Sequence, residues 1–164
     1  MRSRFVLLPL FFLVSTISGC GQKSPPAPPA SNELLIKGAD ISWTSEMEAS
    51  GKKLYNASGV EKDPVLLMKE LGMNAIRLRV WVNPADGWNG LQDVINKAMR
   101  VRQAGMKLLI DFHYSDSWAD PGKQNPPATW AGLGVAAMCD SVRAHTIRVL
   151  SALVLRGVTP EWVQ

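Results

Sequence analysis

One pattern repeats three times along the chain: a segment with helical spacing ends in a glycine, and an apolar run follows directly. The glycines are Gly72, Gly105 and Gly157. Glycine is favoured there because the residue after a helix often takes a positive φ. With an opening strand near residues 34–41, the pattern predicts the order β-α-β-α-β-α-β, which indicates parallel strands covered by helices in a barrel or a doubly wound sheet. No GxGxxG or P-loop motif follows the first strand, which argues against a nucleotide-binding sheet.

The helices of this repeat have recognisable starts and apolar faces. Asp63 and Pro64 supply an N-cap and a proline at the first helical position. A third helix is predicted between about residues 135 and 156. The positions expected on the apolar faces of the three helices are Val65, Leu66, Met68 and Leu71, then Leu91, Val94, Ile95, Ala98 and Val101, then Val135, Met138, Val142 and Val149.

The N-terminus has the features of a bacterial export signal. Arg2 and Arg4 precede an apolar stretch at residues 5–14 that is too short to span a bilayer as a helix. The run Ile-Ser-Gly-Cys, which ends at Cys20, resembles a lipobox. We therefore interpret residues 1–19 as a lipoprotein signal peptide and Cys20 as the lipid-modified mature N-terminus. The alternative is an ordinary cleaved signal in which the cysteine is incidental.

The residues around the signal indicate where the protein resides. Gly21 stands where an aspartate would hold a lipoprotein in the inner membrane, so an outer-membrane lipoprotein at the cell surface or in the periplasm is expected, anchored to the membrane by its lipid. Residues 20–33 are rich in proline and predict an extended linker, with the folded domain at residues 34–164. Cys139 then has no disulfide partner and is expected to be a small packed apolar side chain.

Composition narrows the possible partners. The chain is 46% hydrophobic and 20% charged, which is typical of a globular protein. The net charge of +4 comes from scattered residues without a basic run, so nucleic acid is a poor candidate.

Charged side chains gather on one face of the predicted strands. Arg77 and Arg79 share a face of the second strand, Asp111 and His113 share a face of the third, and Asp40 lies on the first. In parallel α/β folds, ligands bind at the carboxyl ends of the strands. The combination predicts a site there, although ion pairs with only a structural role are the alternative for the arginines.

Tryptophans flank the same strand ends. Flat indole faces suit the apolar faces of sugar rings, although some of these side chains are expected only to pack loops. His145 falls in the third helix and is assigned no function. The tryptophans in or beside the loops are Trp43, Trp81, Trp88, Trp118 and Trp130.

Five sequence runs occur in a recognisable order. They are GADISW from residue 38, LYNASGVEKD from 54, LGMNAIRLRVWVNP from 71, LLIDFHYSDSWADPGKQ from 108 and TPEWVQ from 159. Together they resemble the arabinogalactan endo-β-1,4-galactanases of glycoside hydrolase family 53. The resemblance implies a (β/α)8 TIM barrel, of which residues 34–164 would form the first half with about four βα units. It also implies retaining hydrolysis of β-1,4-galactan, the side chains of pectin.

The resemblance also suggests roles for individual residues. The residues expected to line the substrate cleft are Asp40, Arg77, Arg79, Trp81, Asp111, His113 and Trp118. In the family, the acid/base glutamate ends strand four within a Gly-Asn-Glu run and the nucleophile lies on strand seven, so the resemblance implies that both lie beyond Gln164. Glu161 falls at the start of strand four and is assigned no catalytic role. No metal or cofactor is assigned.

Two functions follow from these observations. The first is a galactan-degrading glycoside hydrolase of which this chain is a truncated and inactive part, because a barrel of this kind needs ~250 residues. The second is a non-catalytic, galactan-binding surface lipoprotein. A half barrel would also expose two sheet edges that the complete barrel covers.

Overall fold

The computed structural model describes residues 35–164. The predicted signal peptide at residues 1–19, the lipidation site Cys20 and the linker at residues 20–33 lie outside the described residues.

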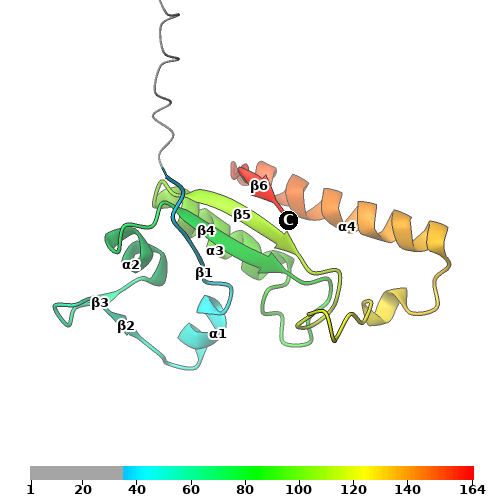
Figure 1. The fold of residues 1–164 in the computed structure, drawn as a ribbon, viewed down its shortest axis with the longest axis horizontal. Helices are drawn as coiled ribbons and strands as arrows, with labels where there is room; N and C mark the ends of the chain where they lie inside the picture. The colour runs from blue at the N-terminus through cyan, green and yellow to red at the C-terminus, as the bar shows by residue number, and fades with distance from the viewer. Residues whose placement is uncertain (1–34) are drawn as a thin grey trace, which may run out of the picture. The chain divides into compact units, whose positions relative to one another are not determined.

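The main sheet consists of parallel strands in the order β1-β4-β5-β6 (Figure 1). The register pairs Asp40 with Arg77 and Arg79 with Asp111, so the polar positions predicted on neighbouring strands align. Successive strands of this sheet are neighbours, as in a βα barrel. The strands are β1 (Gly38–Asp40), β4 (Ala75–Val80), β5 (Lys107–Phe112) and β6 (Trp162–Val163).

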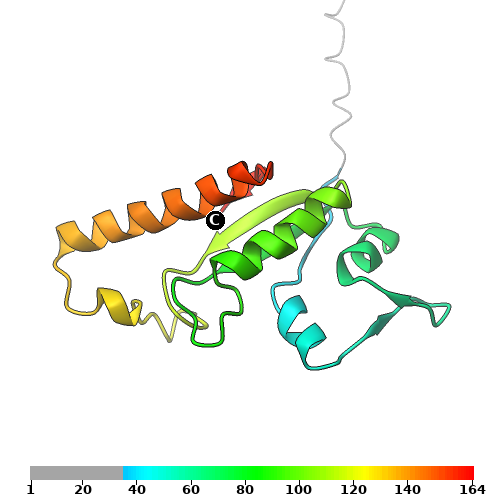
Figure 2. The same cartoon turned by 180° about the vertical axis from the view of Figure 1, so that it is seen from behind.

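Helices connect and cover these strands. The helix α3 (Leu91–Gln103) lies across one face of β4 and β5, as Figure 2 shows from behind, and α4 (Val135–Leu155) runs beside β6. The remaining elements are α1 (Thr44–Ala49), α2 (Pro64–Glu70), the 3-10 turn η1 (Ala128–Trp130) and an antiparallel hairpin of β2 (Leu54–Tyr55) and β3 (Glu61–Lys62). The hairpin was not among the predicted elements.

The core lies between the sheet and α3. Ile76 and Leu78 of β4 are fully buried, as are Val94, Ala98 and Val101 of α3. Alternation along β4 therefore turns its aliphatic residues toward α3 and its arginines to the opposite face. That arrangement confirms the predicted faces of the strand and leaves the charged face free to form a site.

The helix ends also match the sequence pattern. The carboxylate Oδ1 of Asp63 accepts hydrogen bonds from the backbone N–H groups of Val65 (2.8 Å) and Leu66 (3.0 Å), which confirms the predicted N-cap of α2. The three glycines predicted to end helices have φ values of 86° at Gly72, 66° at Gly105 and 71° at Gly157.

Two predictions for α4 were wrong. Val135 is 83% exposed, and Cys139 is exposed instead of packed. The physical reason is that the first turns of α4 lie beside η1 and its loop, away from the sheet (Figure 1). The buried side chains of α4 are His145, Val149 and Leu153, farther along the helix. Among residues 35–164, no helix has the length and apolar character needed to cross a bilayer.

Candidate functional site

Four of the predicted site residues form one chain of charges across three strands. Arg77 Nη1 lies 2.6 Å from Asp40 Oδ2, and Arg77 Nη2 lies 2.5 Å from Asp111 Oδ2. His113 Nε2 lies 2.8 Å from the same oxygen of Asp111. Neighbouring parallel strands in register bring these side chains to the same end of the sheet. The alternative left open by the sequence was that Arg77 and Arg79 form ion pairs with Asp40 or Asp111, and the structure shows such pairs for Arg77.

Asp40 is held in its charged form. Burial acts to raise the pKa of Asp40, but hydrogen bonds from Ser42 and Arg77 and the charge of Arg79 outweigh it, so the pKa lies below the ordinary value of 3.8. Ser42 donates from both its Oγ (2.6 Å) and its backbone N–H (2.9 Å) to Asp40 Oδ1. Ser42 Oγ also accepts a hydrogen bond from the backbone N–H of Arg79 at 2.8 Å. Asp40 can thus accept hydrogen bonds at neutral pH but cannot donate a proton.

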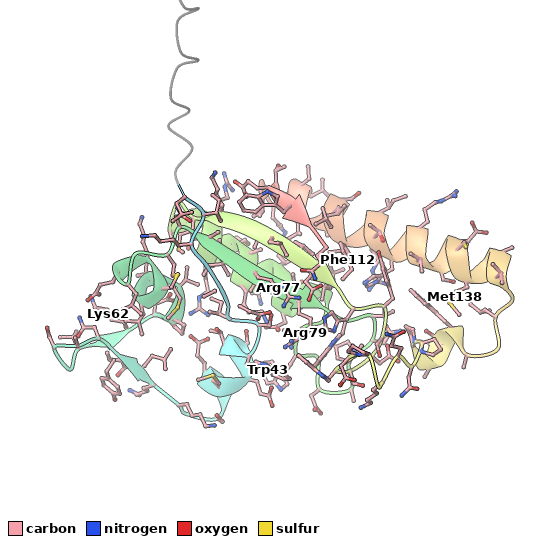
Figure 3. All side chains as sticks on the ribbon, viewed as in Figure 1. Trp43, Lys62, Arg77, Arg79, Phe112 and Met138 are labelled. Atoms are coloured by element: carbon pink, nitrogen blue, oxygen red, sulfur yellow. The ribbon has the colours of Figure 1, made fainter. Side chains whose placement is uncertain are left out.

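Arg79 lies inside a cage of three tryptophans, although its side chain is charged. Its guanidinium carbon is 4.6 Å from the ring centroid of Trp43, 5.2 Å from Trp81 and 4.7 Å from Trp118. Arg79 is only 2% exposed, and burial lowers its pKa. Figure 3 shows Arg77 and Arg79 on the same face of the sheet, with Trp43 near Arg79. Within the described residues, Nε and Nη2 of Arg79 make no hydrogen bond, so its burial is compensated by the cation–π contacts and by the nearby charges of Asp40 and Asp111.

The tryptophans differ in how far they reach solvent. Trp43 is 42% exposed and Trp118 is 45% exposed, whereas Trp81 is buried and meets Trp43 edge to face at 5.8 Å. Trp130 is also buried and packs against Tyr114 and His145. Two indoles therefore offer surface to a ligand, while Trp81 and Trp130 pack the loops.

Asp116, which sequence reasoning missed, ties two loops together. Its Oδ1 accepts the backbone N–H of Asn83 in the loop after β4, and its Oδ2 accepts that of Ala128 in η1, both at 2.8 Å. These bonds fix the loop that carries Trp118. Only the position of Asp116 after a strand, among other polar residues, could have indicated this role.

Lys97, also missed, lies 1% exposed on the core face of α3. Its signal in the sequence was a lysine within the apolar spacing of Val94, Ala98 and Val101. Glu161, by contrast, lies where it was predicted: its Oε2 accepts the backbone N–H of Leu108 at 2.7 Å, near the amino end of β5. It is therefore at the opposite end of the sheet from His113.

The side chains of residues 35–164 form no group of three or more histidine, cysteine or acidic residues that could hold a metal ion. The site is thus built from ion pairs and indoles. Parallel βα strands with charged groups and tryptophans at their carboxyl ends are typical of a βα-barrel protein, in which ligands bind at that end of the strands.

Comparisons with known proteins identify the kind of barrel. Residues 36–164 match the sequence profile of Glycosyl hydrolase family 53. An endo-beta-1,4-galactanase of Bacillus subtilis is 38% identical over 141 residues, which cover 81% of this chain and 33% of that protein. Among solved structures, the GH53 catalytic domain of Ignisphaera aggregans is 38% identical with a TM-score of 0.74, and the alignment covers 79% of this chain and 38% of that one.

A solved fungal beta-1,4-galactanase is 36% identical with a TM-score of 0.76 over 79% of this chain and 39% of its own. The chain belongs to glycosyl hydrolase family 53. It spans 33% of the length of the Bacillus relative. Its fold is the first half of a (β/α)8 TIM barrel, with four strands in barrel order, as predicted.

Proposed function

We propose that this chain is the substrate-binding part of a retaining endo-β-1,4-galactanase that acts on β-1,4-galactan and pectic arabinogalactan. Family membership and the similarity to the endo-beta-1,4-galactanase of Bacillus subtilis support this substrate. The observation that carries the proposal is the tryptophan cage around Arg79, which holds two indoles at solvent beside a row of hydrogen-bonding groups.

The exposed faces of Trp43 and Trp118 pack against the apolar faces of galactose rings. Asp40 and His113, held in place by Arg77 and the buried Asp111, hydrogen-bond the sugar hydroxyls. His113 lies 5.8 Å from Trp118 between ring centroids, so one sugar can touch an indole and a polar group together.

Arg79 and Trp81 have supporting roles in this proposal. Both are buried, and they fix the positions of the exposed indoles.

Retaining hydrolysis requires two carboxyl groups about 5 Å apart, one as acid/base and one as nucleophile. Asp40 and Asp111 are both paired with Arg77, and Glu161 binds backbone at the other end of the sheet. We therefore propose that both catalytic glutamates lie outside residues 35–164, and that the chain alone binds galactan without cleaving it.

Because Asp40 and Asp111 both form ion pairs with Arg77, the structure also favours a second function, that of a non-catalytic galactan-binding lipoprotein. In either case, we propose that lipid on Cys20 anchors the protein to the bacterial outer membrane.

Calorimetry with galactotetraose and a reducing-end assay on linear β-1,4-galactan test the proposal with the full 164-residue chain. We expect measurable binding and no reducing ends above a boiled control. Trp118→Ala should weaken binding, while Tyr55→Ala, at an exposed aromatic residue of β2 in the hairpin, should leave it unchanged. Reducing ends released by the chain would contradict its inactivity, and binding that is unaffected by Trp118→Ala would contradict the proposed site.

The two functions separate in a longer form of the protein. A chain that continues past Gln164 with a Gly-Asn-Glu run and hydrolyses galactan supports the hydrolase. A longer chain without that run, which binds but does not hydrolyse, supports the non-catalytic lipoprotein.

A further inference from the structure

Lys97 is a charged side chain buried within the hydrophobic face of α3. It is 1% exposed. Burial lowers the pKa of Lys97, although the hydrogen bond and charge of Asp93 oppose that change. A buried ammonium is costly unless its donors are satisfied, so its partners show what holds it there.

The ammonium of Lys97 joins three separate elements. It lies 2.8 Å from Asp93 Oδ2 on its own helix. It donates to the backbone oxygen of Ser42 at 2.6 Å, in the loop after β1, and to Asn89 Oδ1 at 3.0 Å, in the loop after β4. An ammonium has three donors, and these three acceptors match them.

Each of the two loop partners is directly connected to the tryptophan cage. Ser42 precedes Trp43 in sequence, and its Oγ accepts the backbone N–H of Arg79 at 2.8 Å. The backbone oxygen of Asn89 accepts the N–H of Trp81 at 2.8 Å. Asn89 itself has a φ of 60°, a left-handed conformation that asparagine tolerates better than most residues.

Through these hydrogen bonds, the ammonium of Lys97 is linked to the loops that carry Trp43 and Trp81, two of the three tryptophans of the cage. We propose that Lys97 is a positioning residue: it fixes the loops after β1 and β4 so that Trp43 and Trp81 close around Arg79, and it thereby sets the affinity of the site for galactan. Its effect on galactan rests on the proposed function, whereas its effect on the cage does not.

The edge-to-face pair of Trp43 and Trp81 gives a direct spectroscopic readout, because two close indoles couple their electronic transitions and produce a paired circular-dichroism band. We expect Lys97→Met to fold cooperatively but to lose this band, approaching the spectrum of Trp43→Phe, in which the pair is absent. Its tryptophan fluorescence should also become more accessible to acrylamide.

Lys69→Met is the matched control. Lys69 is anchored to a single backbone oxygen, that of Ala104, at 2.6 Å, and it lies on α2, away from the cage. Its replacement should change thermal stability without changing the indole band. A Lys97→Met protein with the wild-type band and wild-type quenching, and only a lower Tm, would overturn the proposal.

A second variant covers the case in which Lys97→Met does not fold. Asn89→Gly keeps the positive φ and the backbone oxygen that binds Trp81, but it removes one acceptor of Lys97. It should partly lose the indole band, and an unchanged band would overturn the proposal. Calorimetry with galactotetraose then measures the effect on ligand binding. We expect Lys97→Met to bind galactotetraose roughly 10-fold more weakly than the wild-type chain. If the wild-type chain binds no galactotetraose, the proposed function fails, while the spectra still decide the role of Lys97.

Discussion

Arg77 and His113 meet at one oxygen atom, Oδ2 of Asp111, which lies 2.5 Å from Arg77 Nη2 and 2.8 Å from His113 Nε2. The side chain of Asp111 is only 4% exposed, so these two partners, rather than solvent, satisfy this oxygen. The two residues should nevertheless differ in what their loss does, because Arg77 also bridges to Asp40 and His113 does not.

Arg77→Met should destabilise the fold, because it leaves Asp111 and Asp40 without their shared cation. Breaking a buried pair costs about 3–5 kcal/mol, but Arg77 is 33% exposed, so we expect about 1–3 kcal/mol in urea unfolding. Adding Asp111→Asn should recover part of the loss. Lys53→Met is the control, because Lys53 and Glu61 are both more than half exposed and solvent screens their ion pair, so its loss should be much smaller than that of Arg77→Met.

His113→Ala should damage catalysis more than folding in a galactan-hydrolysing form of the protein. A polar group that positions substrate is worth on the order of 2–4 kcal/mol in the transition state. We therefore expect a large loss of kcat/KM with a small change in Tm. Near-normal turnover in a destabilised protein would show that His113 is only an ion-pair partner of Asp111.

Asp63→Ala should weaken the start of α2. The change removes an N-cap, worth about 1–2 kcal/mol, and the ion pair with Arg100 at 2.6 Å. Asp63→Asn keeps the capping oxygen but loses the charge, so its loss in urea unfolding should be smaller. Equal losses for the two variants would mean that the charge, and not the cap, stabilises the helix.

His145 should make stability depend on pH. Burial, followed by the charge of Arg148, lowers the pKa of His145 below its ordinary value of 6.5. The unfolded chain then binds a proton before the folded one as pH falls. The contribution of His145 to the free energy of unfolding is therefore fully present above about pH 6.5. It is lost as pH falls toward the pKa of His145 in the folded protein, with a slope of at most about 1.4 kcal/mol per pH unit.

His145→Gln removes the titrating group, so subtracting its unfolding free energy from that of wild type at each pH isolates the effect. We expect the difference to be flat above pH 6.5 and to decline below it. A difference that stays constant across this range would contradict the assignment.

Cys20 should carry the lipid in a bacterial host. Labelled palmitate should appear in the wild-type protein and be absent from Cys20→Ser, because the thiol is the acceptor. Equal labelling of both proteins would exclude Cys20 as the modified residue.

Local rules were enough to predict the elements of the barrel. Positive φ at Gly72 and the cap at Asp63 depend on only a few neighbouring residues, and the face shared by Arg77 and Arg79 follows from strand alternation. The resemblance to a family supplied the substrate, which periodicity could not.

The failures concern contacts between distant segments. Val135 has helical spacing, but whether it is buried depends on where α4 lies beside η1. From the sequence alone, Lys97 would be taken for a surface lysine. Its acceptors lie in the loops after β1 and β4, 55 and 8 residues away in sequence, and only the fold brings them to the ammonium. The cage around Arg79 likewise combines three loops that only the folded sheet brings together.

The unequal strands of the sheet should be visible in amide hydrogen exchange. β4 pairs with β5 along its whole length and with β1 over its first three residues, whereas β1 and β6 are short and lie at the edges. Amides in β4 are therefore expected to exchange only when the entire domain opens, while the amides of β1 and β6 exchange through local fraying. The slowest amides to exchange would then include those of Arg77 and Arg79, so the backbone that carries the candidate site would be the most protected part of the domain.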